Sequence, residues 1–455
     1  MEKDKDFLGT EPIGKLLLRL AIPTLAAQLI NMLYNVVDRI YIGHIPKVGA
    51  LALTGVGVCM PLIMIVSAFA VLVGNGGAPR ASIYMGQNNK EDAEKTLGNC
   101  FATQILVAIV LTIVLLLGNR TFLLAFGASE NTISYAAAYM NIYAVGTIFV
   151  QLTLGLNAFI TAQGFAKTGM LSVLIGAVIN IVLDPIFIFG LHMGVRGAAL
   201  ATIISQACSC IWVVSFLFGK KTFLKIQRKN MKLEARIILP SLALGLATFI
   251  MQASESIITV CFNSSLLKYG GDIAVGAMTI LTSVMQFAML PLQGLGQGAQ
   301  PILSYNYGAK SVDRVRGTFR LLLKVKRWIC SDSVVMCRTF CHRFSSACSH
   351  QTQHCLHLAR LALRVYMAAM FMFGIQIACQ MGFTSLGCAP ESIIVAVMRK
   401  FVLLIPLIYI VPHIWSADRT MGVYLAEPIA DFFAVTFTMI LFSNRFKKAL
   451  KKVEK

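Results

Sequence analysis

The sequence has little charge for its length. Asp, Glu, Lys and Arg make up 13% of the 455 residues, whereas about a quarter of a soluble globular chain is charged. Acidic residues are the scarcer kind, with 20 Asp and Glu against 40 Lys and Arg. This composition argues against an ordinary soluble domain. It also makes any acid inside an apolar run worth explaining.

Several sequence signals are absent. Neither glycine-rich segment, 74–77 or 294–298, is followed by the Lys-Ser/Thr of a phosphate-binding loop, so we expect no chemistry driven by ATP. These glycines are better suited to close helix contacts. The first apolar run, near Leu16, lacks the cleavage site of a signal peptide, and we expect it to remain as a span. Six of the twelve cysteines lie inside apolar runs, which does not suggest a disulfide framework.

Long apolar runs recur through the chain, which is 57% hydrophobic with a mean hydropathy of +0.73. A helix needs about 20 mostly apolar residues to cross a bilayer core. The expected spans are 16–42, 48–74, 95–118, 134–158, 169–190, 196–218, 238–263, 273–297, 315–340, 362–386, 392–413 and 418–442. We therefore predict an all-α membrane protein with twelve transmembrane helices in two six-helix lobes, residues 1–218 and 237–455. Residues 219–236 form the linker.

The basic residues predict the orientation. They cluster in the linker 219–236, in the tail after 443 and in the gaps after spans 2 and 8, while the alternate gaps contain fewer. By the positive-inside rule these segments face the cytoplasm. We therefore expect a multi-pass protein of the bacterial inner membrane with both termini cytoplasmic. The net charge of +20 then reflects topology, and we expect no nucleic-acid partner.

The two halves resemble each other. Short matches occur in the same order in both: residues 21–26 with 238–243, Gly76, Pro79, Ser82 and Gly86 with Gly298, Pro301, Ser304 and Gly308, and Thr161 and Gly164 with Thr384 and Gly387. The shared order favours a duplication. A half with an even number of spans repeats in parallel, about an axis along the membrane normal, and the substrate site then lies between the halves.

Three acids inside predicted spans stand out, and Asp184 is considered first. Asn180 lies one helical turn earlier on the same face, and Pro185 follows and removes a backbone donor. A carboxylate with freed carbonyls offers hard oxygen atoms to Na⁺ or a site to a proton. Asn157 and Thr202, in neighbouring spans, would add neutral oxygens. The alternative is an acid at a helix end before Pro185, although residues 186–189 remain apolar.

Asp38 lies late in the first span, next to Arg39. An acid inside a membrane costs several kcal/mol and is a functional candidate by default. We interpret Asp38 as a second cation or proton ligand in the first half. The alternative is an interfacial acid that pairs with Arg39.

Glu255 lies near the middle of the seventh span, where a helix-end explanation is poor. A carboxyl group removed from water binds a proton more readily. Gln286 in the eighth span, with Gln376 and Gln380 in the tenth, are candidates for the same second-half cavity. Hydrogen bonding between helices explains these glutamines equally well.

With these residues in view, the chain resembles the multidrug and toxin extrusion (MATE) transporters over almost its whole length. The resemblance rests on segments 21–24, 37–43, 164–167, 180–185 and 291–298. It implies two six-helix lobes, alternating access, and exchange of drugs, often organic cations, for Na⁺ or H⁺. It also implies a first-lobe ion site at the positions matching Asp38, Asn157, Asn180, Asp184 and Thr202. The position matching Glu255 carries a second-lobe cation in some branches, but the acid that those branches have in the tenth helix is absent here.

Residues 325–360 break the pattern of a ninth helix. They contain four of the seven histidines and five of the twelve cysteines, and no uncharged apolar run approaches 20 residues. The candidate zinc ligands are Cys337, Cys341, His342, Cys348, His350, His354 and Cys355, but their spacings form no clean ligand pairs. A frameshift explains the composition better. The central U of Leu, Ile, Val, Phe and Met codons then becomes a first U, which encodes Ser, Cys, Trp, Tyr, Phe or Leu.

The sequence thus predicts a secondary active antiporter that exports small organic compounds in exchange for Na⁺ or H⁺. We expect it to be monomeric and to have no enzyme activity, no resident metal and no cofactor besides the coupling ion. The alternatives are a related lipid or polysaccharide flippase, or a transport-inactive product of a frameshifted gene. A flippase cavity is often lined by several basic residues, and we expect the membrane interior outside residues 325–360 to be nearly free of them.

Overall fold

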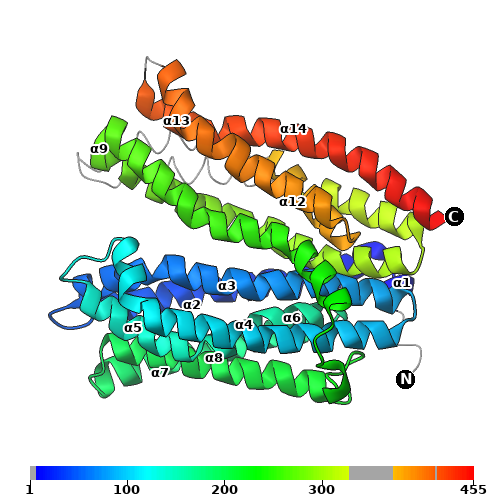
Figure 1. Ribbon diagram of the computed structural model, residues 1–455, viewed down its shortest axis with the longest axis horizontal. Coiled ribbons are helices and arrows are strands. Elements are labelled where there is room, and N and C mark those ends of the chain that lie inside the picture. The colour runs from blue at the N-terminus through cyan, green and yellow to red at the C-terminus, as the bar shows by residue number, and fades with distance from the viewer. Residues whose placement is uncertain (1–6, 327–371, 416–417, 455) are drawn as a thin grey trace.

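A computed structural model describes residues 7–326, 372–415 and 418–454. Within these ranges the secondary structure is helical and contains no strand. Figure 1 shows the helices in two groups. The first group contains α1 (Phe7–Thr10), α2 (Ile13–Gly43), α3 (Gly49–Gly86), α4 (Lys90–Ala125), α5 (Ile133–Val145), α6 (Thr147–Ala162), α7 (Ala166–Pro185), the π-helix η1 (Ile186–Gly190) and α8 (Val195–Phe218).

An extended linker with a short 3₁₀-helix, η2 (Arg228–Asn230), leads to the second group. That group contains α9 (Ala235–Gly308), α12 (Ala389–Val397), the π-helix η3 (Met398–Leu404), α13 (Ile405–Ile414) and α14 (Arg419–Glu454), together with helical residues 312–326 and 372–385. Helix α9 is two helices joined at Gly271, where φ is 63°. Only glycine adopts that backbone region with ψ near −164° readily.

The all-α membrane prediction is confirmed. In the described ranges, eight helices are long and apolar enough to cross a bilayer, or nine if the bent pair α5–α6 forms one span. This count treats α9 as a single helix, and the number twelve remains a prediction. The six spans predicted before residue 219 match α2, α3, α4, α5–α6, α7–η1 and α8 within several residues, and those predicted at 392–413 and 418–442 match α12–α13 and α14. The lobe boundaries remain a prediction.

Large apolar side chains face outward from the bundle. Leu117 is 85% exposed, and Leu18, Leu33, Ile113 and Val260 are also exposed. In water such a surface would drive aggregation, but in a bilayer it contacts lipid tails. The helix–helix interfaces instead hold glycine, alanine, serine and threonine, which let helices in a membrane approach closely.

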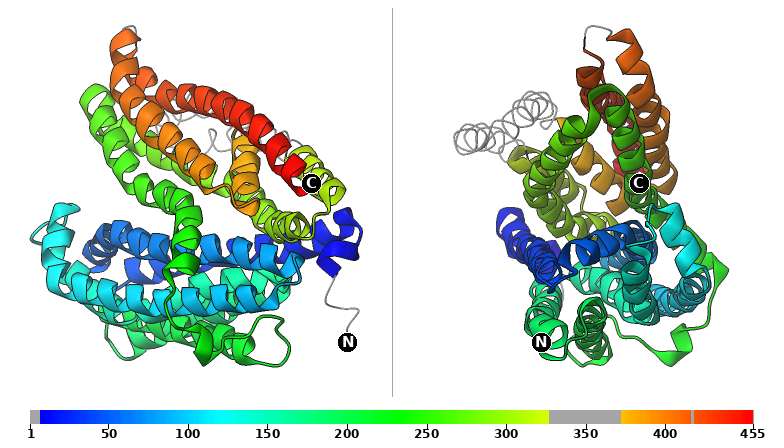
Figure 2. Two further views of the ribbon diagram at one scale, coloured as in Figure 1. Left: turned by 45° about the vertical axis from the view of Figure 1, so that its right-hand side comes forward. Right: turned by 90° about the vertical axis from the view of Figure 1, so that its left-hand side faces the viewer.

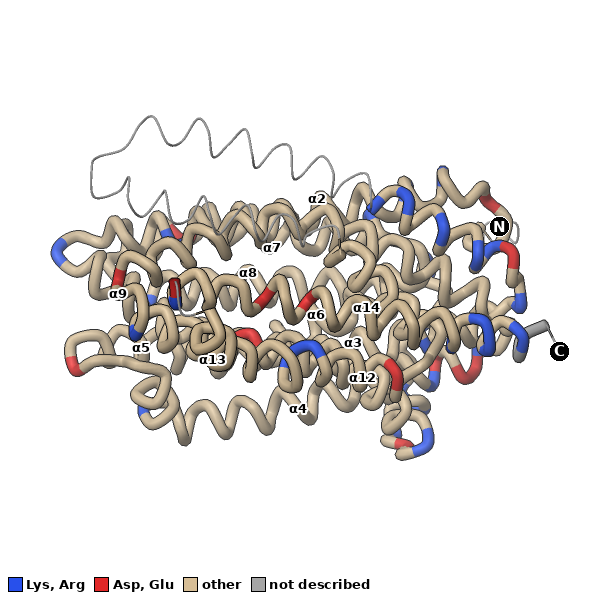
Figure 3. The backbone as a smooth tube through the Cα atoms, turned by 90° about the horizontal axis from the view of Figure 1, so that it is seen from above, with Lys and Arg blue, Asp and Glu red and all other residues tan. Residues whose placement is uncertain are grey.

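Charge is concentrated at one end of the bundle. Figure 3 shows most Lys and Arg at the end where both chain termini lie, with few charged positions along the middle. The two helix groups meet near this end and diverge towards the other (Figure 2, left). The arrangement is that of a V whose apex is the basic end.

Reciprocal glycine contacts join the two groups at the apex. Gly86 of α3 packs against the backbone of Tyr305 in α9, and Gly308 of α9 packs against the backbone of Ile83 in α3. A Cβ atom at either glycine would overlap the carbonyl oxygen opposite. Gly308 follows Gly86 at the same offset at which Tyr305 follows Ile83. The predicted repeat therefore appears in space as a contact with approximate two-fold symmetry.

We expect Gly86→Val to destabilise this closed apex. The added methyl groups force α3 and α9 apart, and overpacking of this kind costs about 1–3 kcal/mol. Thermal unfolding of the purified protein measures the loss. Gly57→Val is the matched control, because it lies on the same helix and a Cβ there has no neighbour within 4 Å. Equal effects of the two substitutions would contradict the close contact.

Candidate functional site

The carboxyl groups of Asp38 and Asp184 meet inside the first helix group. Asp38 lies near the end of α2 and Asp184 near the end of α7, and α2 packs along α7. Their side chains are in hydrogen-bond contact. Two carboxylates this close repel each other unless a proton or a cation lies between them. The pair is therefore a candidate site for a positive charge.

Asn180 extends this site along α7. Its amide donates a hydrogen bond of 3.3 Å to Asp184 Oδ1. Three buried oxygen atoms have no hydrogen-bond partner within the described residues: Asp38 Oδ1, Asn180 Oδ1 and Asp184 Oδ2. A buried acceptor without a partner is costly. Oxygen atoms are also the ligands preferred by hard cations, so this set fits Na⁺ as well as a proton.

Two tyrosines, which the sequence reasoning did not include, border the carboxyl pair. Tyr34 of α2 lies one turn before Asp38, close enough to interact with it electrostatically. Tyr139 of α5 also lies near Asp38, and its hydroxyl hydrogen-bonds with Thr202 of α8. Thr202 is thus connected to the site through Tyr139, while its own hydroxyl donates to the carbonyl oxygen of Ala198. Tyr34 precedes Asp38 by four residues, so its place on the same helix face could be inferred from the sequence. Nothing in the sequence indicated that Tyr139, on another helix, lies near Asp38.

Asn157 lies apart from the other predicted ligands. Its amide donates to the carbonyl oxygen of Gly169, at the beginning of α7, with a distance of 3.4 Å. Gly169 precedes Asn180 by three helical turns, a rise of about 16 Å. Asn157 Oδ1 is buried without a hydrogen-bond partner among the described residues. The structure therefore does not bring Asn157 to the carboxyl pair.

Glu255 forms an ion pair that the sequence reasoning did not anticipate. Its Oε1 atom accepts a hydrogen bond of 2.6 Å from Nζ of Lys400, in η3. The neighbouring Arg399 pairs with Asp431 of α14, with Nε 2.7 Å from Oδ1. The expectation of a membrane interior nearly free of basic residues is thus wrong, since Arg399 and Lys400 are both 2% exposed and lie within the predicted span 392–413. Two adjacent basic residues inside an apolar run were the signal.

The three predicted glutamines do not join Glu255. Gln380 donates a hydrogen bond of 2.7 Å to the Ser392 hydroxyl, which is the interhelical alternative considered for it. Gln376 is 2% exposed, and neither of its amide atoms has a hydrogen-bond partner in the described ranges. Gln286 is exposed on the second part of α9. Of these, Gln376 remains the candidate for an internal polar surface.

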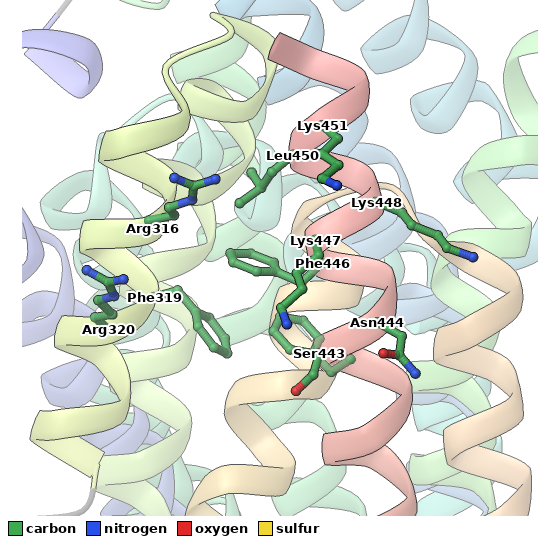
Figure 4. Close-up of a pocket in the computed structure, with 11 residues that line it drawn as sticks. Arg316, Phe319, Arg320, Ser443, Asn444, Phe446, Lys447, Lys448, Leu450 and Lys451 are labelled. Carbon is green, nitrogen blue, oxygen red and sulfur yellow. The ribbon is translucent and has the colours of Figure 1, made fainter. Parts of the chain in front are cut away.

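A basic pocket of about 790 Å³ lies at the end that carries the termini, between residues 312–326 and α14. Figure 4 shows Arg316, Arg320, Lys447 and Lys451 around Phe319 and Phe446. The described residues that line the pocket include no acid. The pocket is therefore a poor match for a cation, and its charge agrees with the positive-inside pattern.

The Cys/His cluster and the proposed frameshifted stretch lie outside the described residues, apart from residues 325 and 326. The ninth span is described only at its beginning, as helical residues 312–326. Among the described residues, no group of three or more His, Cys, Asp or Glu side chains is arranged to hold a metal ion. The prediction about the cluster remains a prediction.

Known proteins resemble this chain over nearly all of its length. The multidrug export protein MepA of Staphylococcus haemolyticus is 24% identical and is matched over 97% of both chains. The probable multidrug resistance protein YoeA of Bacillus subtilis is 22% identical over 92% of this chain and 90% of its own. Two solved structures, one titled as MATE in the bent conformation and the other as an outward-facing multidrug resistance MATE family transporter, superpose with a TM-score of 0.90 at 23% identity. They cover 97% and 99% of both chains, respectively.

A match to a family profile bears on the internal repeat and on the family of the chain. The MatE family profile matches residues 23–186 and again residues 246–410. Two matches to one profile confirm the predicted internal duplication, and together they cover most of the chain. The chain therefore belongs to the MatE family of multidrug and toxin extrusion transporters.

Proposed function

We propose that this protein exports small organic compounds, organic cations among them, in exchange for Na⁺ or H⁺. The observation that carries the proposal is the contact between Asp38 and Asp184 inside membrane-length helices, bordered by oxygen atoms that have no hydrogen-bond partner among the described residues. A site of this kind gains a cation or a proton when it faces one side and loses it on the other. MepA and YoeA are named as a multidrug export protein and a probable multidrug resistance protein, which supports the same class of substrate.

Coupling requires that the ion and the substrate favour different states of the protein. A ligand shifts a conformational equilibrium only by its difference in affinity between the two states. In the proposed cycle, the ion occupies the Asp38–Asp184 pair in the V-shaped form, and its release on the cytoplasmic side accompanies closure of the V. We place the basic end in the cytoplasm of a bacterial inner membrane and propose that a single chain, acting as a transporter and not as an enzyme, suffices.

The test is transport by purified protein in lipid vesicles with Na⁺ and pH gradients imposed separately. We expect the Na⁺ gradient, the pH gradient or each of them to drive accumulation of ethidium, a fluorescent organic cation. Vesicles without a driving gradient should show only leakage. Protein-free vesicles give the background. Accumulation that is the same with and without any gradient would contradict antiport.

A further inference from the structure

In this structure the ammonium group of Lys400 pairs with Glu255, the predicted carboxylate of the second half. The Lys400 side chain is 3% exposed, while the side chain of its partner Glu255 is 52% exposed. The lysine thus reaches Glu255 from inside the helix group, and the carboxylate remains open on its other side. It lies in η3, a π-helical turn within the span Ala389–Ile414, and such turns often occur at functional sites.

A second carboxylate lies in the same cluster as this ammonium group. Glu427 of α14 interacts electrostatically with Lys400. Its nearest ionic contact is Arg399 Nη2 at 3.9 Å, which is longer than a hydrogen bond. Arg399 Nη2 itself is buried without a hydrogen-bond partner among the described residues, since its guanidinium is held by Asp431 and by the ring of Phe373. Among the described residues, the Glu427 carboxyl group can therefore accept a further hydrogen bond.

The cluster contains more acidic than basic side chains. It contains the acids Glu255, Glu427 and Asp431 and the bases Arg399 and Lys400. An anionic ligand would add to the imbalance, whereas a cation would correct it. Arg399, Lys400 and Asp431 are buried, and charges interact more strongly away from water.

We propose that Lys400 is a tethered competitor for the substrate site: an organic cation binds Glu255 and displaces the Lys400 ammonium, which moves to Glu427. This inference rests on the proposed function, because it assigns organic cations to a particular carboxylate. After the exchange, Glu255 pairs with the organic cation and Glu427 pairs with Lys400. The ammonium group thus retains a partner, which a buried charge requires. The flexible four-carbon stem of lysine allows it to change partners, unlike the planar and doubly held guanidinium of Arg399.

Equilibrium binding of ethidium to the purified full-length chain tests this proposal without a gradient. We expect Lys400→Met to bind ethidium about tenfold or more tightly, because the internal competitor is gone. Lys400→Arg retains the competing charge, and its affinity stays near that of the wild type. Lys268→Met, which removes an exposed lysine from the same helix as Glu255, is the matched control. Thermal unfolding verifies that each variant is folded.

The role of Glu427 gives the second part of the test. Glu427→Gln removes the alternative partner, so we expect it to weaken ethidium binding in the wild type. In the Lys400→Met background we expect Glu427→Gln to leave the ethidium affinity unchanged, because there is no Lys400 ammonium group for Glu427 to bind. A lysine with only a structural role predicts independent effects of the two substitutions.

Three outcomes separate this inference from the proposed function. Tighter binding by Lys400→Met together with dependence of the Glu427 effect on Lys400 supports the exchange. Wild-type export and binding of ethidium with unchanged or weaker binding by Lys400→Met overturns the exchange and leaves the proposed function intact. Failure of the wild type both to bind and to export ethidium overturns both.

Discussion

Asp184→Asn should abolish gradient-driven export while the protein still inserts into the membrane. Asparagine keeps the size of the side chain and its hydrogen bond to Asn180, but it cannot hold a proton or balance a cation. A hydrogen bond to a charged group contributes about 1.5–3 kcal/mol, so ion binding should weaken about 10- to 100-fold. Ethidium accumulation in vesicles with an imposed gradient measures the loss.

Asp38→Asn should have the same effect, because the two carboxyl groups act as a pair. Glu91→Gln is the control: Glu91 is an exposed acid that pairs with Lys95 at the beginning of α4, away from the site. It should leave export unchanged. Normal export by both aspartate variants would remove the carboxyl pair from the mechanism.

Arg399→Leu should cause the largest loss of stability among the single substitutions discussed. It leaves Asp431, which is 3% exposed, without its 2.7 Å partner inside the membrane span. Removing one member of a buried ion pair costs about 3–5 kcal/mol. The substitution also removes the contact between the guanidinium and the Phe373 ring. Thermal unfolding and the monodisperse fraction after purification report the loss.

The double variant Arg399→Leu/Asp431→Asn distinguishes a lost pair from a lost side chain. Because no charge remains uncompensated at Asp431, it should recover most of the stability that Arg399→Leu loses. A double variant as unstable as the single one would show that packing of Arg399, and not its charge, is what the fold requires. Lys95→Leu, which breaks an exposed pair with Glu91, should have little effect.

The sequence was sufficient for much of the fold because a bilayer imposes a simple length rule. Apolar runs near 20 residues became helices α2 to α8, and the short matches between the halves paired Gly86 with Gly308, although they did not predict the contacts that these glycines make. The bend between α5 and α6, 58° at Gly146, was not predicted, because hydropathy does not depend on the direction of a helix. The divergence of the two helix groups at one end was not predicted either, because a pattern of residues does not determine how two groups of helices are placed relative to each other.

The site was predictable only where its residues share one helix. Asn180 and Asp184 are one turn apart on α7, so their contact follows from helical geometry alone. The contact of Asp184 with Asp38, the approach of Tyr139, and the distance of Asn157 depend on how helices pack. Lys400 lies in a predicted span, but its pairing with Glu255 joins two different helices and does not follow from the sequence pattern.

Displacement of the coupling ion by substrate is the most direct test of the central claim. Purified protein in weakly buffered solution is mixed with ethidium while a pH indicator and a sodium electrode record release. We predict that the wild type releases protons or Na⁺ on binding and that Asp184→Asn binds ethidium without releasing either. Undiminished release from Asp184→Asn would contradict an ion site at the Asp38–Asp184 pair.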